Sequence, residues 1–191
     1  LTPVTLELGG KNPCIIDKNV SIDIASKRII FGKFLNCGQT CIAPNFLAIH
    51  EDIKELFINS LVKNIKSIYG DDPKNSPFYS NIISEYHVDR LSKLLKNSKI
   101  IYGGKFEKSM KYFEPTIVEV SSIQDKILDD EIFGPILPII TYGSVDELDS
   151  ILERSKNPLA FYVFTNNKKF GKKLINDYPF GGGAINDTIG Q

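Results

Sequence analysis

Short runs of β-branched and aromatic residues alternate along the chain with longer stretches in which apolar residues recur every three or four positions. The longer pattern is clearest over 53–69, where one apolar stripe of an amphipathic helix is formed by Ile53, Phe57, Leu61, Ile65 and Ile68. Further helices are expected over 22–35, 84–97, 144–155 and 165–178, and strands over 13–17, 46–50, 99–104, 136–142, 159–165 and 183–186.

Local signals support this division. Ser144 and Glu147 have the spacing of a capping box and predict the start of the helix that runs to about Ser155. The segment 70–82 is rich in Gly, Pro, Asn and Ser and is expected to be a surface loop. Strands 136–142 and 159–165 are apolar almost throughout, which is typical of strands buried on both faces. The alternation of strands and helices predicts an α/β fold with a mostly parallel, twisted sheet flanked by helices.

Composition narrows the class of protein. The 191 residues are enough for one sizeable core, and 42% hydrophobic with 24% charged residues is ordinary for a globular domain. Lys and Arg equal Asp and Glu at 23 each, so no charge excess favours a nucleic acid or an anionic membrane as partner. No apolar run is long enough to span a bilayer, and the first residues lack the pattern of a signal peptide. A low, odd number of cysteines, three, fits a reducing compartment and predicts a cytoplasmic protein.

Metal and phosphate motifs are not complete. Three cysteines and two histidines, with Cys37 and Cys41 spaced CxxxC, leave too few ligands for structural zinc, and we predict no metal site. The sequence ELGGK lacks the first glycine and the hydroxyl residue of a Walker loop. The sequence GGGAIN has Asn186 where a dinucleotide-binding loop needs its third glycine.

The segment NCGQTCIAP at 36–44 carries the chain's main candidate for chemistry. Cys41 follows a predicted helix and precedes a predicted strand, in a loop where Gly38 permits a tight turn and Pro44 prevents further helix. A thiol is an intrinsically strong nucleophile even when only a few per cent is ionised at neutral pH. From these residues alone Cys41 could be a nucleophile, half of a redox pair, a ligand or a small buried hydrophobe.

Three motifs in order resemble those of the aldehyde dehydrogenase superfamily. They are LELGGKNP from Leu6, FLNCGQTCIAPN at 34–45 and EIFGPILPI at 131–139, and they are most similar to the class 3 branch, whose members act on fatty and aromatic aldehydes. The separations are 34 residues from Glu7 to Cys41 and 90 from Cys41 to Glu131. The similarity covers the whole chain and implies an aldehyde dehydrogenase catalytic domain over residues 1–191.

The resemblance implies oxidation of an aldehyde to a carboxylic acid with NAD or NADP. Cys41 matches the nucleophile, whose thiolate forms a thiohemiacetal and then a thioester, with its own backbone N–H stabilising the oxyanion. Glu7 matches the general base that activates water to hydrolyse the thioester. A relative that runs in reverse, reducing an activated acyl group, is disfavoured by Glu7, because hydrolysis would waste the thioester.

The resemblance also implies cofactor contacts. Glu131 matches the carboxylate that binds the nicotinamide ribose, Phe133 the aromatic side chain near the nicotinamide, and Leu8 a residue whose carbonyl meets the carboxamide. Lys11 and Asn186 are interpreted as structural. Cys14 is expected in the core. Cys37 is either a packing residue or a thiol that can form a reversible disulfide with Cys41.

Compared with the family, the chain is expected to lack a dinucleotide-binding half before it and a dimer-building segment after it. The homodimer, the choice between NAD and NADP, and any C-terminal membrane anchor would then depend on residues outside this chain, and the isolated segment is expected to be weakly active or inactive. The alternative is a non-catalytic domain whose Cys37 and Cys41 sense redox state or mediate binding.

Overall fold

The computed structural model describes residues 2–4 and 9–190. Within these residues the helices are α1 (Ile22–Phe34), α2 (Lys54–Tyr69), α3 (Glu85–Leu94), α4 (Val145–Leu152) and α5 (Lys168–Asp177). The strands are β1 (Pro13–Ile16), β2 (Phe46–His50), β3 (Lys99–Tyr102), β4 (Phe106–Glu107), β5 (Tyr112–Phe113), β6 (Thr116–Glu119), β7 (Ile136–Tyr142), β8 (Ala160–Phe164) and β9 (Gly182–Ile185).

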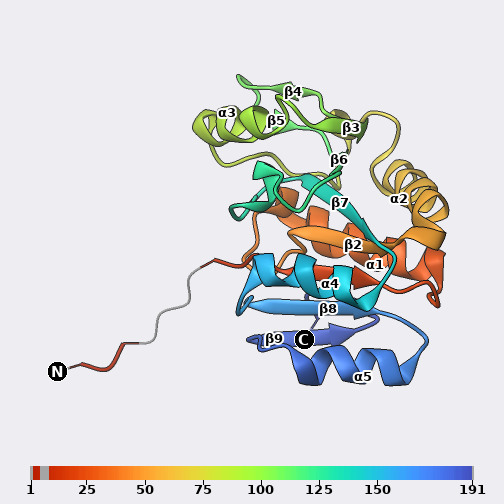
Figure 1. The fold of residues 1–191 in the computed structure, drawn as a ribbon. Helices are drawn as coiled ribbons and strands as arrows, with labels where there is room; N and C mark the ends of the chain where they lie inside the picture. The colour runs from red at the N-terminus through yellow and green to blue at the C-terminus, as the bar shows by residue number, and fades with distance from the viewer. Residues whose placement is uncertain (1, 5–8, 191) are drawn as a thin grey trace.

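Seven of the strands in the described part of the chain form one sheet, in the order β3-β6-β7-β2-β1-β8-β9 (Figure 1). Every neighbouring pair is parallel except β3 with β6 at one edge, which is antiparallel. The small β4-β5 hairpin stands apart from the sheet. The predicted α/β fold with a mostly parallel sheet is therefore confirmed.

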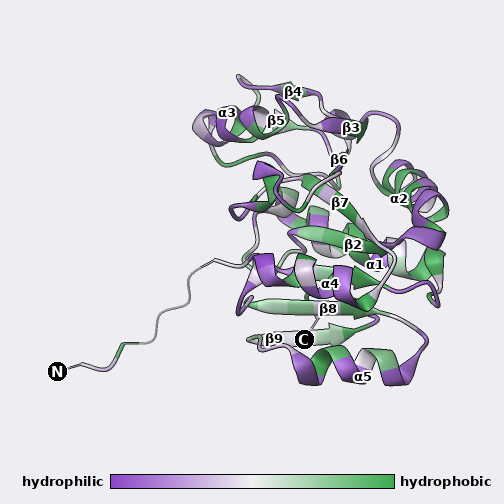
Figure 2. Cartoon of the chain, viewed as in Figure 1, coloured by the Kyte–Doolittle hydropathy of each residue, from purple (hydrophilic) through white to green (hydrophobic). Residues whose placement is uncertain are grey.

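Helices cover both faces of the sheet and give two cores. One core packs α1 and α2 against side chains such as Cys14, Ile16 and Leu47, and the other packs α3, α4 and α5 against their chain neighbours such as Ile15 and Ala48. Successive strand residues point to opposite faces, so a strand buried on both sides must be apolar throughout. Figure 2 shows this continuous hydrophobic character in the central strands, and all five residues of β8 are buried.

The strand predictions hold within one or two residues, but three strands were missed. The most important is β6, which lies inside the sheet between β3 and β7. Its four residues follow Pro115 directly, and a run this short gives little periodicity to read. The predicted helix over 84–97 is shorter in the structure and ends at Leu94.

The capping prediction at Ser144 is confirmed with one difference. The Ser144 hydroxyl accepts a hydrogen bond from the Glu147 N–H (3.2 Å), as in a capping box. The Glu147 carboxylate instead accepts from the N–H of Gly143 (2.7 Å), one residue earlier than the motif predicts. The α-helix ends at Leu152 and continues as a 3₁₀ turn through Ser155.

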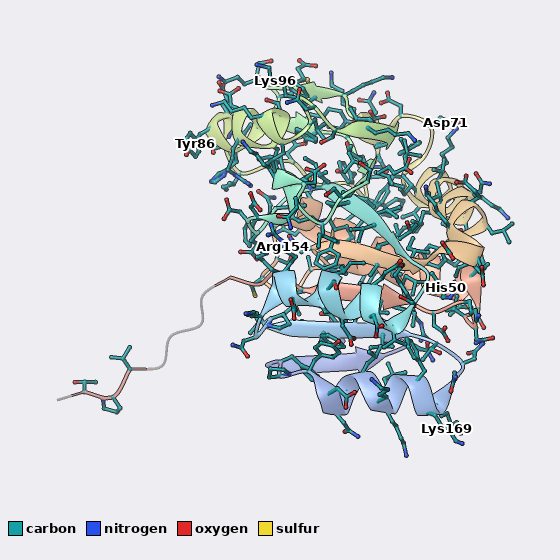
Figure 3. The ribbon with its side chains drawn as sticks, in the orientation of Figure 1. His50, Asp71, Tyr86, Lys96, Arg154 and Lys169 are labelled. Atoms are coloured by element: carbon teal, nitrogen blue, oxygen red, sulfur yellow. The ribbon has the colours of Figure 1, made fainter. Side chains whose placement is uncertain are left out.

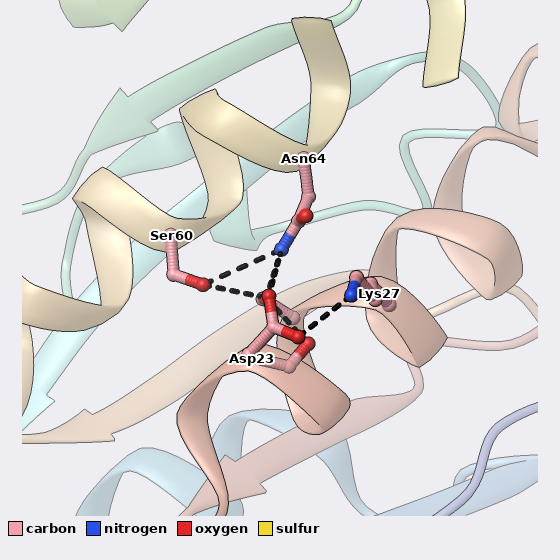
Figure 4. A network of polar contacts seen from close by, with 5 residues as sticks. Asp23, Lys27, Ser60 and Asn64 are labelled. Carbon is pink, nitrogen blue, oxygen red and sulfur yellow. Dashed lines mark hydrogen bonds and ion pairs between the residues drawn. The ribbon is translucent and has the colours of Figure 1, made fainter. Parts of the chain in front are cut away.

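A partly buried polar network joins α1 to α2 (Figure 4). The Asn64 amide donates to the Ser26 hydroxyl (2.7 Å) and to the Asp23 carboxylate (3.2 Å). The Ser26 hydroxyl is in turn 2.8 Å from that of Ser60. Because Ser26 and Asn64 are buried, these hydrogen bonds satisfy groups that would otherwise lose their hydration without compensation.

Asp71, Lys96 and Lys169 are exposed and lie on the outside of the molecule, as Figure 3 shows. Positive and negative groups are interspersed, with ion pairs such as Lys173 with Asp177 and Lys108 with Asp89. Within residues 2–4 and 9–190, no helix combines the length and the apolar character needed to cross a membrane.

Candidate active site

The second and third sequence motifs, and the described part of the first, meet at one edge of the sheet. Strands β1, β2 and β7 run parallel and in register, so the segments that precede them, 9–12, 41–45 and 131–135, lie together at the amino-terminal edge. Along the chain, the first and second segments are about 30 residues apart, and the second and third are about 90 residues apart. The sheet therefore assembles a site that no single segment could form.

The cysteine loop leaves α1 through a sharp reversal of the backbone. Asn36, Cys37 and Gly38 have φ angles of +50°, +57° and +72°, in the left-handed region. A Cβ atom at Gly38 would lie 2.3 Å from the carbonyl oxygen of Gly134, so only glycine allows this loop to touch the third motif. The Gln39 side chain then ties the loop to the segment around Ile83, whose N–H it accepts at 2.9 Å.

Cys41 lies half-buried in the turn before β2, and Asn12 holds that turn. The Asn12 amide donates to the carbonyls of Cys41 (2.8 Å) and Ala43 (2.9 Å), and its oxygen accepts the N–H of Ala160 (2.7 Å). Asn12 is fully buried. A Cβ atom at Gly10 would lie 2.6 Å from the Cys41 carbonyl oxygen, so the first motif approaches the cysteine turn through a glycine.

Glu131 places a carboxylate next to the first motif. Its Oε1 accepts the N–H of Gly10 (3.0 Å), and a Cβ atom at Gly9 would lie 2.1 Å from its Oε2. Burial raises the pKa of Glu131, against the Gly10 hydrogen bond and the nearby charges of Lys33 and Arg90, which lower it. One carboxylate edge is thus anchored to the backbone, while acceptor capacity remains for hydroxyl groups of a ligand.

The residues after Glu131 are held from two sides. The Asn45 side-chain oxygen accepts the N–H of Ile132 (2.9 Å), and the Arg90 guanidinium donates to the carbonyls of Ile132 (2.6 Å) and Phe133 (3.3 Å). Phe133 has a φ of +45°, and the residue is 42% exposed. The ring borders an open cavity of about 370 Å³ that Glu131 also lines.

The other two thiols belong to the core. Cys37 is inaccessible to solvent, its Sγ donates to the Tyr79 hydroxyl (3.4 Å), and burial raises its pKa to about 12. Cys14 lies in β1, and burial raises its pKa well above the usual range. The position of Cys37 agrees with the packing interpretation, because a thiol without solvent contact and with so high a pKa is a poor partner for disulfide exchange.

Four more residues were assigned roles from the sequence: Glu7, Leu8, Lys11 and Asn186. Glu7 and Leu8 lie outside the described residues. Lys11 donates to the carbonyl of Asp129 (2.8 Å), which ties the first motif to the loop before the third. Asn186 exchanges hydrogen bonds with the backbone of Thr165, in agreement with a structural role.

Four residues near the site were not predicted. Asn12 and Asn45 sit inside the quoted motifs, but their partners are distant in sequence, and Arg90 had no distinguishing pattern around it. Lys33 is fully buried on α1, and burial lowers its pKa to about 7 despite the opposing charges of Glu131 and Cys37. Its apolar neighbours Ile29, Ile30 and Phe34 were the only signal that could have shown its burial.

Comparison with known proteins places these features in a family. The model of the "Aldehyde dehydrogenase family" matches residues 1–191. The chain is 43% identical over 191 residues to 4,4'-diaponeurosporen-aldehyde dehydrogenase of Staphylococcus aureus, covering 99% of this chain and 42% of that protein. It is 42% identical over 189 residues to "Aldehyde dehydrogenase, dimeric NADP-preferring" of Rattus norvegicus, again covering 99% and 42%. The chain thus spans about two fifths of the length of these relatives.

Solved structures show the same fold. The substrate-bound state of Staphylococcus aureus AldH superposes with a TM-score of 0.95 at 42% identity, covering 98% of this chain and 41% of that one. An NADP-complexed glyceraldehyde-3-phosphate dehydrogenase of Methanocaldococcus jannaschii gives a TM-score of 0.84 at 29% identity, covering 95% and 40%. With its motifs gathered at one sheet edge and the family model matched from end to end, the chain belongs to the aldehyde dehydrogenase family.

Proposed function

We propose that this chain is the catalytic segment of an enzyme that oxidises an aldehyde to a carboxylic acid with NAD or NADP. The observation that carries the proposal is the fixed Cys41 turn at the sheet edge that also presents Glu131 and Phe133. Since the chain spans about two fifths of its relatives, the activity is that of the complete enzyme containing these 191 residues.

Cys41 supplies the covalent step. Its thiolate attacks the aldehyde carbon to form a thiohemiacetal, whose oxyanion is stabilised by the backbone N–H of Cys41. Loss of one such donor typically costs about 3–4 kcal/mol of transition-state stabilisation. The Asn12 hydrogen bond to the Cys41 carbonyl fixes the turn, so that the thiol and its N–H keep one orientation during attack.

NAD or NADP, when bound, would supply the acceptor for the hydride that leaves the thiohemiacetal carbon. Loss of that hydride leaves a thioester on Cys41. Glu131 would hold the ribose hydroxyls through the carboxylate edge that Gly10 does not occupy, and Phe133 would pack near the nicotinamide. The carbonyl of Leu8 would accept from the carboxamide. The exposed Phe133 ring beside the Glu131 carboxylate fits such a ligand, which combines hydroxyl groups with a flat ring.

Glu7 is proposed as the general base that takes a proton from water. The resulting hydroxide attacks the thioester carbonyl, the C–S bond breaks, and the acid leaves with Cys41 restored. Glu7 lies outside the described residues, and its role rests on its place in the first motif.

The substrate is proposed to be a medium- or long-chain aliphatic aldehyde or an aromatic one. The support is the similarity to class 3 enzymes and to a relative named for 4,4'-diaponeurosporen-aldehyde. The rat relative is named dimeric and NADP-preferring, and a homodimer is proposed for the complete enzyme here. A cytoplasmic location is proposed from the low cysteine content.

The redox-sensing alternative has less support. It needs Cys37 to reach Cys41 as a reactive thiol, and Cys37 is buried with its pKa raised to about 12.

The test is Cys41→Ala in the complete enzyme, assayed for NAD(P)H formation with a medium-chain and an aromatic aldehyde. We expect at least a roughly 10³-fold loss of kcat, because no nucleophile remains. Glu7→Gln should still release about one NAD(P)H per active site in a rapid burst and then turn over slowly, because acylation survives and hydrolysis does not. Retained steady-state turnover in Cys41→Ala would refute the proposal.

A further inference from the structure

We propose that Arg90 is a positioning residue for the nicotinamide end of the cofactor site. It acts by holding the backbone between Glu131 and Gly134 in a conformation that presents Glu131 and Phe133 to one ligand. This inference rests on the proposed function and assigns a task to a residue outside the three family motifs.

The Arg90 guanidinium reaches the third motif from α3, a separate element more than 40 residues away in sequence. Its Nη2 donates to the carbonyl oxygens of Ile132 (2.6 Å) and Phe133 (3.3 Å), and its Nε donates to His87 Nδ1 (3.3 Å) on the same helix. The planar guanidinium fork offers several donors in fixed directions, which suits the bridging of two acceptors.

The two carbonyls that Arg90 holds are those on either side of the Phe133 backbone. Phe133 has a φ of +45°, a conformation that non-glycine residues seldom adopt and that needs compensation from its surroundings. In an extended residue the flanking carbonyls point in opposite directions, so one nitrogen could not reach both. The Nη2 contacts therefore favour the tight left-handed turn over an extended backbone at Phe133.

This turn decides where two predicted cofactor contacts point. Glu131 lies immediately before Ile132 and Phe133, the two residues whose carbonyls Arg90 holds, and Phe133 carries the aromatic ring. Arg90 itself lines the same 370 Å³ cavity as Glu131, Phe133 and His87. Burial raises the pKa of Glu131, and the guanidinium charge of Arg90 partly opposes that rise, after the Gly10 hydrogen bond and the charge of Lys33.

Other groups around the turn do not duplicate this task. Asn45 accepts the N–H of Ile132 and so fixes the backbone before the strained residue, whereas Arg90 holds the carbonyl of Phe133 itself. Gly38 approaches Gly134 from the cysteine loop and limits the space behind the turn. Of the described side chains, Arg90 alone donates to both carbonyls that flank Phe133.

The test uses Arg90→Met and Arg90→Lys in the complete enzyme, with Lys93→Met, an exposed change on the same helix, as the matched control. Four quantities are measured: the dissociation constant of NAD(P)H by fluorescence titration, KM for the cofactor, KM for the aldehyde, and the melting temperature. We expect Arg90→Met to weaken cofactor binding about 10- to 100-fold while KM for the aldehyde changes less than about twofold. Arg90→Lys should lie between Arg90→Met and the parent, because one ammonium cannot bridge both carbonyls in the guanidinium geometry.

Unchanged cofactor affinity in both variants would overturn the inference. So would equal weakening of cofactor and aldehyde accompanied by a lower melting temperature, because that pattern marks a merely structural tie between α3 and the loop. If Arg90→Met does not fold, Arg90→Lys decides alone, with weaker cofactor binding at the parent's melting temperature as the supporting result. Cys41→Ala, assayed in parallel, separates the two claims. If Cys41→Ala abolishes turnover while the Arg90 variants bind the cofactor normally, only the inference about Arg90 fails. If Cys41→Ala retains turnover, the proposed function fails.

Discussion

The side-chain amide of Asn12 and the main-chain carbonyl of Cys41 are joined by a 2.8 Å hydrogen bond across 29 residues of sequence. The same amide serves the Ala43 carbonyl, and its oxygen serves the Ala160 N–H, so one buried side chain connects β1, the cysteine turn and β8. The turn that carries Cys41, the proposed nucleophile, is therefore held by an uncharged side chain of the first motif.

Asn12→Ala should destabilise the protein by about 3 kcal/mol, because it leaves one buried donor and two buried acceptors without this partner. Urea denaturation followed by circular dichroism measures the change. Asn97→Ala, at an exposed position, is the control and should stay within about 0.5 kcal/mol of the parent. A loss no larger than that of the control would show that water replaces the Asn12 amide.

Iodoacetamide should modify Cys41 at least about tenfold faster than Cys14 or Cys37 in the folded protein. Cys41 is half-buried, whereas the other two thiols have no solvent exposure and raised pKa values. Mass spectrometry of peptides after timed labelling reports each site separately. All three should react at similar rates in denaturant, and similar rates in the folded protein would contradict the structure.

Stability should depend on Lys33 in a defined pH range. Burial lowers the pKa of Lys33 from 10.5 to about 7. Well below pH 7 the lysine is charged in both states, so the full cost of burying its charge opposes folding. Between about pH 7 and 10.5 only the unfolded chain keeps the proton, and the folded state gains stability as pH rises.

Lys33→Met should accordingly be more stable than the parent at neutral pH, by a few kcal/mol at most. The difference in free energy of unfolding between the two proteins should become smaller toward about pH 10. Urea denaturation at several pH values measures both proteins. Lys63→Met on the exposed side of α2 provides the control and should show no such trend. A margin that is constant with pH would mean that Lys33 keeps its proton in the folded protein.

Asn64→Ala should cost about 1–2 kcal/mol, because it removes the amide that joins Ser26 and Asp23 across α1 and α2 (Figure 4). Ser26 would keep its hydrogen bond to the Asp23 carbonyl (3.0 Å), which limits the loss. Thermal unfolding compares this variant with Asn59→Ala, an exposed position on the same helix. Equal melting temperatures for Asn64→Ala and Asn59→Ala would show that the network does not contribute to stability.

The sequence by itself determined the class of fold and the chemical candidates. Periodicity located the long helices and the central strands, because residues buried on a helix stripe or on both faces of a strand leave a pattern within a few neighbours. The motifs marked Cys41, Glu131 and Phe133, together with Glu7 and Leu8, which the structure does not describe. Those roles stay proposals.

Only the tertiary structure decided how the site is held together. The strand β6 was missed because four residues after a proline carry almost no periodic signal, although the sheet needs it between β3 and β7. The tasks of Asn12, Asn45 and Arg90 depend on partners 29 to 148 residues away. The contacts of Asn12 and Asn45 arise because parallel strands bring their amino-terminal ends together, and those of Arg90 arise because α3 packs beside the third motif. No local pattern of residues encodes which distant carbonyl a side chain will meet.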